Sequence, residues 1–144
     1  MKGKKSLLYS IIIGLTLTHI GVIIMGYLAA IAVPKEFFFG FSNPKSGLVF
    51  LDVVTHFLAF GLLAVTAGFV IGKISHQHCL RDILACYASV LIYFSIGVSI
   101  IYDVSIMMPY QMAAYSYYIP PFIIPICLIC GTHLSGNGVL RFNR

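Results

Sequence analysis

Charged side chains are scarce in this sequence, and their scarcity excludes both a typical soluble domain and a disordered chain. Only 9% of the 144 residues are Asp, Glu, Lys or Arg, whereas soluble domains average about 25%. Four residues are acidic, 14% are aromatic and 60% are hydrophobic, so the low hydrophobicity that disorder requires is missing. The mean hydropathy of +0.99 indicates a membrane protein.

The chain also lacks the length for a second domain and the motifs of a soluble enzyme. Its 144 residues suffice for one compact bundle, because domains average roughly 100–200 residues, and this excludes an appended kinase, hydrolase or DNA-binding module. No phosphate-binding loop or nucleophile–base pair is present, so the sequence leans towards a non-enzymatic protein. Cations at membrane edges, which anionic lipid attracts, account for the net charge of +5, and no nucleic-acid partner is predicted.

Four apolar runs are present, each close to the roughly 20 residues that a spanning helix requires. They cover residues 7–33, 48–72, 83–101 and 112–130. The first run exceeds the apolar core of a cleaved signal peptide, about 7–15 residues, so we expect an uncleaved anchor. The fourth contains Pro120, Pro121 and Pro125, which predict a kinked helix. The sequence therefore predicts an all-α membrane protein, a single domain of four transmembrane helices in contact with the lipid bilayer.

Lysine and arginine are distributed unevenly between the two sides of these spans. Seven lie on one side of a four-span topology and two lie on the other. The seven are Lys2, Lys4, Lys5, Lys73, Arg81, Arg141 and Arg144, and the two are Lys35 and Lys45. Because short loops rich in Lys and Arg stay in the cytoplasm, both termini are predicted to be cytoplasmic.

Ionisable side chains inside a membrane are costly and mark candidate functional sites, which here singles out His19, Asp52, His56 and Asp103. Asp52 and His56 are four residues apart, so a helix places both on one face, in the outer third of the bilayer. A carboxylate there orients a histidine ring for metal binding or proton handling. The alternative is a self-satisfied pair that holds two helices in register. We expect the two side chains to face the bundle interior as one hydrogen-bonded unit, and the loss of either to matter about equally.

The segment from Leu51 to Ala64 resembles the VanZ-like family of small bacterial membrane proteins. The family's motif is an Asp followed by His-Phe and an aromatic-leucine pattern that opens a span. Asp52, His56, Phe57, Phe60 and Leu63 stand at those positions, and Val53 stands where the family often has Lys. The resemblance covers about the first half of the chain. It implies a multi-pass protein of the bacterial inner (plasma) membrane, linked in some members to glycopeptide-antibiotic resistance, and it implies no known reaction.

Two further residue sets have the spacing of cofactor or metal sites. His19, near the middle of the first span, and His56 are candidate haem ligands, although their depths differ by roughly 6 Å at a rise of about 1.5 Å per residue. Cys127, Cys130 and His133 are candidate zinc or redox ligands; the alternative is that the cysteines are small apolar core residues. No second Cys-x-x-Cys pair accompanies the first, so no cofactor or metal is predicted.

Ala64, Gly68 and Gly72 recur every four residues along the second span. Small residues at this spacing let two helices approach closely. The partner helix belongs either to this chain or to a second membrane protein, including another copy of this one.

Two functions follow from these residues. The first is a non-enzymatic envelope protein, VanZ-like in antibiotic or envelope-stress resistance, or an immunity or exclusion factor. The second is a membrane subunit of a redox or metal-dependent enzyme that uses Asp52, His56 and His19.

Overall fold

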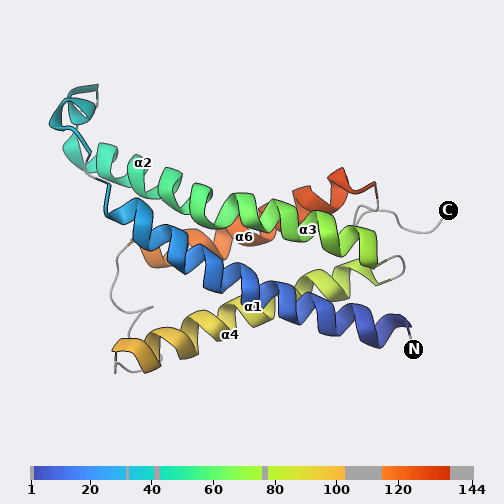
Figure 1. Ribbon diagram of the computed structural model, residues 1–144. Helices are drawn as coiled ribbons and strands as arrows, with labels where there is room; N and C mark the ends of the chain where they lie inside the picture. Colours follow the sequence, from blue (N-terminus) through green and yellow to red (C-terminus); the bar gives the residue numbers. More distant parts are fainter. Residues whose placement is uncertain (1, 32, 41–42, 76–77, 103–114, 137–144) are drawn as a thin grey trace.

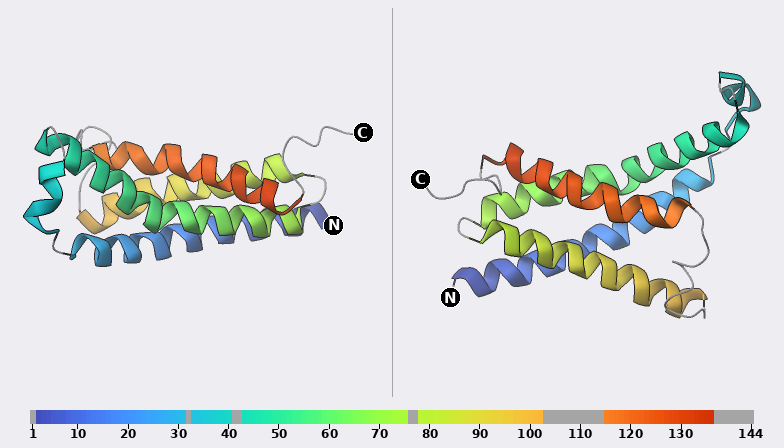
Figure 2. Two further views of the ribbon diagram at one scale, coloured as in Figure 1. Left: turned by 90° about the horizontal axis from the view of Figure 1, so that it is seen from above. Right: turned by 180° about the vertical axis from the view of Figure 1, so that it is seen from behind.

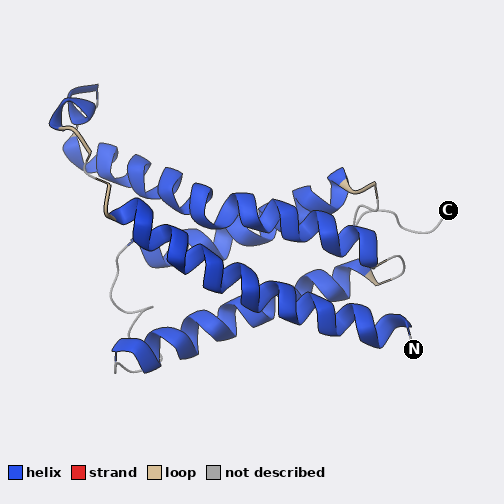
Figure 3. Cartoon of the chain, viewed as in Figure 1, coloured by secondary structure: helices blue, strands red, loops and turns tan. Residues whose placement is uncertain are grey.

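Every regular element of the described chain is a helix. The computed structural model describes residues 2–31, 33–40, 43–75, 78–102 and 115–136. The elements are α1 (Lys2–Ala29), a short 3-10 helix η1 (Lys35–Gly40), α2 (Pro44–His56), a π-helical turn η2 (Phe57–Gly61), α3 (Leu62–Ile74), α4 (Cys79–Tyr102) and α6 (Tyr115–Leu134) (Figure 1). Figure 3 shows helices and loops and no strand among the described residues. The predicted all-α fold class is confirmed for these residues.

Three helical segments are long and apolar enough to cross a membrane, namely Gly3–Leu28, Ser46–Ile74 and Cys79–Ile96. The second of them comprises α2, η2 and α3 in unbroken succession. A fourth apolar stretch, Ile119–Leu134, is shorter. Large apolar side chains are exposed on all four, as contact with lipid requires. The chain is therefore a helical membrane protein.

The helices do not begin and end where the apolar runs do. α1 begins at Lys2, ahead of the run at 7–33, because lysine is a good helix former. It ends at Ala29, where the N–H groups of the next two residues bond to carbonyls three positions back and Pro34 disfavours helical geometry in the residue before it. α4 begins at Cys79 and carries Asp82 in its first turn, where the helix dipole favours a carboxylate.

The chain runs back and forth along one axis (Figures 1 and 2). α1 and α4 run in the same direction and pack side by side, and α3 and α6 form a second closely packed parallel pair. The start of α1 and the end of α6 lie at the same end of the bundle (Figure 1). We call this end the N-terminal end, and the opposite end, where α2 begins, the distal end.

The small residues of the second span are used inside the chain. Ala64, Gly68 and Gly72 are all buried. A side chain at position 68 would collide with the backbone of Leu128, and one at position 72 would collide with Ser135. The glycines thus allow α3 and α6 to approach closely. The partner helix of these small residues therefore belongs to this chain. Binding of a second copy stays a prediction, and it would have to use another surface.

α6 keeps its helical assignment across Pro120, Pro121 and Pro125. Proline has no N–H, so Pro125 leaves the carbonyl of Pro121, four residues earlier, without its helical partner. The hydroxyl of Tyr87 on α4 donates a hydrogen bond to that carbonyl at 2.9 Å. This contact joins α4 to α6 and satisfies a backbone group that has no access to water inside a membrane.

Candidate functional site

Asp52 and His56 lie on the same side of the last turns of α2, as their spacing predicts. His56 is 5% exposed and its Nδ1 atom lies 3.3 Å from Oδ1 of Asp52, whose side chain is one-quarter exposed. The same nitrogen is closer to the main-chain oxygen of Asp52, at 2.8 Å. A carbonyl oxygen only accepts hydrogen bonds, so Nδ1 carries a proton and donates it there. The carboxylate is the second, longer contact of that nitrogen.

A π-helical turn begins directly after His56. The N–H of Leu62 bonds to the carbonyl of Phe57, five residues earlier, so the turn contains one residue more than an α-helix would. Ala59, Phe60 and Gly61 are consecutively buried as a result. Single π turns inside α-helices are frequent at functional sites, and the continuous apolar pattern of this span gave no sign of one.

The ring of Phe60 packs against the imidazole of His56. It stacks on His56 with 6.2 Å between ring centroids and an interplanar angle of 23°. Its other neighbours are Phe94 of α4, at 5.5 Å between centroids, and Gly21 of α1, where a side chain would collide with the ring. The imidazole is therefore enclosed by α2 and an aromatic pair that reaches the core, and its position is set by packing as well as by hydrogen bonding.

His19 belongs to a different contact. Its Nδ1 atom lies 2.8 Å from the hydroxyl of Tyr93 on α4, and the two rings meet edge to face with 6.2 Å between centroids. His19 is exposed, whereas His56 is buried beside η2. The two candidate haem ligands thus have separate partners, one between α1 and α4 and one within the second span.

The candidate metal ligands of α6 do not converge in the structure. Cys127 is buried, whereas Cys130 and His133 are exposed. Among the described residues, no group of three or more His, Cys, Asp or Glu is positioned to hold a metal ion. Asp103, the remaining candidate from the sequence, lies outside the described residues.

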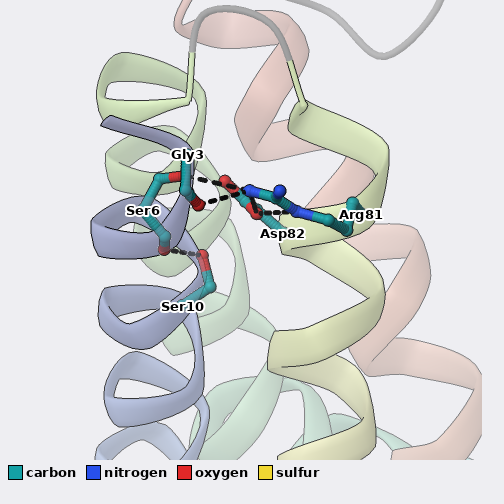
Figure 4. Close-up of polar contacts among 5 residues, drawn as sticks. All are labelled: Gly3, Ser6, Ser10, Arg81 and Asp82. Atoms are coloured by element: carbon teal, nitrogen blue, oxygen red, sulfur yellow. Dashed lines mark hydrogen bonds and ion pairs between the residues drawn. The ribbon is translucent and has the colours of Figure 1, made fainter. Parts of the chain in front are cut away.

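A second polar unit, absent from the sequence-based candidates, lies at the N-terminal end. Asp82, near the start of α4, is fully buried, and its Oδ1 atom accepts hydrogen bonds from Nε and Nη2 of Arg81 at 2.9 and 2.7 Å. Nη2 also donates to the carbonyl of Gly3 at 2.7 Å and to Oγ of Ser6 at 3.2 Å. Figure 4 shows the guanidinium in contact with both the carboxylate and the first turn of α1. Arg81 therefore joins the start of α4 to the start of α1.

The other oxygen of this carboxylate faces a serine. Oδ2 of Asp82 and Oγ of Ser75, the residue that ends α3, are buried and have no hydrogen-bond partner of good geometry among the described residues. Ser75 is nevertheless close enough to interact with the carboxyl group. The unit thus brings together residues of α1, α3 and α4.

The sequence contains only a weak signal for this unit. Arg81 and Asp82 precede the apolar run at 83–101 and are adjacent in sequence, a pattern typical of a solvated loop. Their partner Gly3 is 78 residues away, and no local spacing relates the two. The available signal in the sequence is the serine pair of the first helix: Ser6 and Ser10 lie four residues apart, which places both hydroxyls on one face of that helix.

No protein-family model, curated protein or solved structure matches the chain.

Proposed function

We propose that this chain is a four-span protein of the bacterial inner membrane, with both termini in the cytoplasm and a proline-kinked fourth helix, and that it protects the cell without catalysing a reaction. The protective role is either VanZ-like, in resistance to antibiotics or envelope stress, or that of an immunity or exclusion factor. The bilayer is its first partner, and a second membrane protein is the partner that an immunity role requires.

The distribution of charge supports the topology. The described cations of the N-terminal end are Lys2, Lys4, Lys5, Lys73 and Arg81, and those of the distal end are Lys35 and Lys45. Short segments rich in Lys and Arg remain in the cytoplasm, which favours a cytoplasmic N-terminal end. α6 has 20 residues, a length of about 30 Å, which matches the hydrocarbon core of a bilayer.

The enclosed Asp52–His56 pair is the observation that carries the functional proposal. These are the two polar residues of the VanZ-like resemblance, and they lie together, with His56 buried and a π turn directly behind it. A buried imidazole beside a carboxylate is costly to maintain in a membrane, and the π turn gives up regular hydrogen bonding at the same place. Both features favour a binding or recognition role over simple packing.

Reporter fusions test the topology. A reporter that distinguishes cytoplasm from exterior is fused after residues 40, 77, 108 and 144, and we expect external, cytoplasmic, external and cytoplasmic signals in that order. An external signal after residue 144 would overturn the four-span proposal.

Expression in a susceptible bacterium tests the protective role. We expect the wild-type chain to raise the minimum inhibitory concentration of a glycopeptide antibiotic or of another envelope stress, and Asp52→Asn and His56→Gln to abolish the rise at equal membrane abundance. His19→Gln is the matched control, a histidine lost from another contact, and we expect it to retain protection. Absence of any protection by the wild-type chain would contradict the proposal.

The same variants separate this proposal from the redox or metal-dependent alternative. A visible absorption band or stoichiometric metal in the purified protein, lost in both His19→Gln and His56→Gln, would replace the proposed role with that of a cofactor-binding subunit.

A further inference from the structure

The guanidinium of Arg81 is fixed in place, and among the described residues its Nη1 atom makes no hydrogen bond. Nε and Nη2 make four hydrogen bonds, two to the buried carboxylate of Asp82 and two to Gly3 and Ser6 of α1. Nη1 carries none of the dashed contacts in Figure 4. The side chain is 42% exposed, so one part of the group is anchored while the rest reaches the surface. A cation held in this way presents two N–H donors in a set direction.

The imidazole of His78 lies near this nitrogen, beside Gly3. Nη1 lies 3.6 Å from the point where a side chain of Gly3 would begin, and the imidazole of His78 lies 3.4 Å from the same point. Glycine at position 3 therefore leaves open a space that Arg81 and His78 both border. Lys4 and Lys5 follow in the first turns of α1, and both are exposed.

This cluster lies at the depth of lipid headgroups. Arg81 is the third residue of α4, and the apolar segments of α4 and α1 begin at Cys79 and Gly3. Cations within one helical turn of a span boundary reach the phosphate layer of the bilayer. Apolar side chains next to it, including Leu80 and Leu84, are exposed and face the zone that acyl chains occupy.

We propose that Arg81, His78 and Lys4 form a binding site for the phosphate of an anionic phospholipid at the N-terminal end of the bundle. Nη1 of Arg81 is the fixed donor, held by Asp82, Lys4 provides an adjustable cation, and the ring of His78 provides a further hydrogen-bonding group. The inference depends on the chain being embedded in a membrane and is independent of its protective role. Charge complementarity selects an anionic headgroup over a zwitterionic one, and preorganised donors bind with a smaller entropic cost than flexible ones.

The decisive variant keeps the local net charge constant. Arg81→Gln combined with Asp82→Asn removes one positive and one negative charge and leaves no buried unpaired carboxylate. Binding of phosphatidylglycerol and of phosphatidylcholine is measured by native mass spectrometry of the full chain released from detergent. We expect the wild type to favour phosphatidylglycerol and the double variant to bind it about fivefold more weakly, the factor for about one basic residue at a membrane surface.

Controls separate this site from general attraction between charges. Lys45→Gln removes a cation from the distal end, and we expect it to leave the preference for phosphatidylglycerol unchanged. Glycerol phosphate and inorganic phosphate, added instead of lipid, should not compete at the concentrations that saturate lipid binding. Equal binding by the wild type and the double variant, an equal loss in Lys45→Gln, or full competition by free phosphate would each overturn the proposed lipid site.

Discussion

The polar units at the two ends of the bundle are built in different ways. At the distal end, His56 and Asp52 belong to one helix, and the shortest bond of the ring goes to the main chain of that helix. At the N-terminal end, Asp82 is fully buried and Arg81 links it to Gly3, 78 residues away. A local unit forms whenever its helix forms, whereas the second unit forms only when α1 and α4 have docked. The N-terminal unit therefore specifies how the helices pair, and the distal unit does not.

The start of α2 projects from the rest of the described bundle. The first turns of α2 extend beyond the other helices (Figure 1), and Leu48, Phe50 and Val53 on them are exposed. Segments with few packed neighbours open locally at low free energy. We therefore expect the start of α2 to open locally at a lower free energy than the N-terminal end of the bundle.

Removal of Arg81 should have the largest effect on stability. Arg81→Met leaves the buried carboxylate of Asp82 without its cation, and the loss of one partner of a buried pair costs about 3–5 kcal/mol. We expect Arg81→Met combined with Asp82→Asn to recover a large part of this loss, because no charge then stays buried. Unfolding in mild detergent followed by circular dichroism measures both variants. A double variant no more stable than Arg81→Met would contradict the role assigned to the pair.

Glycine substitutions should give the next largest difference in unfolding free energy between the two ends of the bundle. Gly72 faces Thr132 of α6 and Ser135, the residue after that helix, and a side chain at position 72 would collide with Ser135, so we expect Gly72→Val to cost about 1–3 kcal/mol through overpacking. Gly26, in the distal half of α1, has nothing within 4 Å of the added carbon. Gly26→Val is the matched control and should leave the unfolding free energy nearly unchanged. Similar losses of unfolding free energy in both variants would contradict the difference in packing around Gly72 and Gly26.

Part of this structure can be predicted from the sequence alone. The helices, the membrane location and the placement of Asp52 beside His56 follow from apolar run length and from the spacing of residues within one helix. The burial of Asp82 does not, because it depends on Gly3 and Ser6 from the opposite part of the chain. The π turn at Phe57–Gly61 likewise accompanies packing of Phe60 against α1 and α4, which no periodicity within the second span records.

Substitutions of Asp52 and of His56 should lower the free energy of unfolding by less than those above, and by unequal amounts. Spacing alone predicts equal effects for Asp52 and His56, but the ring donates its shorter bond to the main-chain carbonyl of Asp52, which Asp52→Asn retains. We expect Asp52→Asn to cost under about 1 kcal/mol, as for partly exposed ion pairs. His56→Gln should cost about 1–2 kcal/mol through the lost hydrogen bond and the lost contact with Phe60. Equal losses, together with strong coupling in the double variant, would indicate that the carboxylate is the main partner of the ring.

The smallest effect is expected midway between the two ends, at the contact of His19 with Tyr93. This hydrogen bond joins α1 to α4 at 2.8 Å, yet His19 is exposed, so neither group becomes a buried unpaired polar atom when the other is removed. Hydrogen bonds between membrane helices contribute about 0.6 kcal/mol on average, and we expect Tyr93→Phe to cost about that much. His19→Phe should cost no more, because the new ring removes a polar group from the lipid-facing surface and so offsets part of the lost bond. A loss as large as that of Arg81→Met, measured in the same detergent, would show that pairing of α1 with α4 is specified along their whole length and not at the N-terminal end.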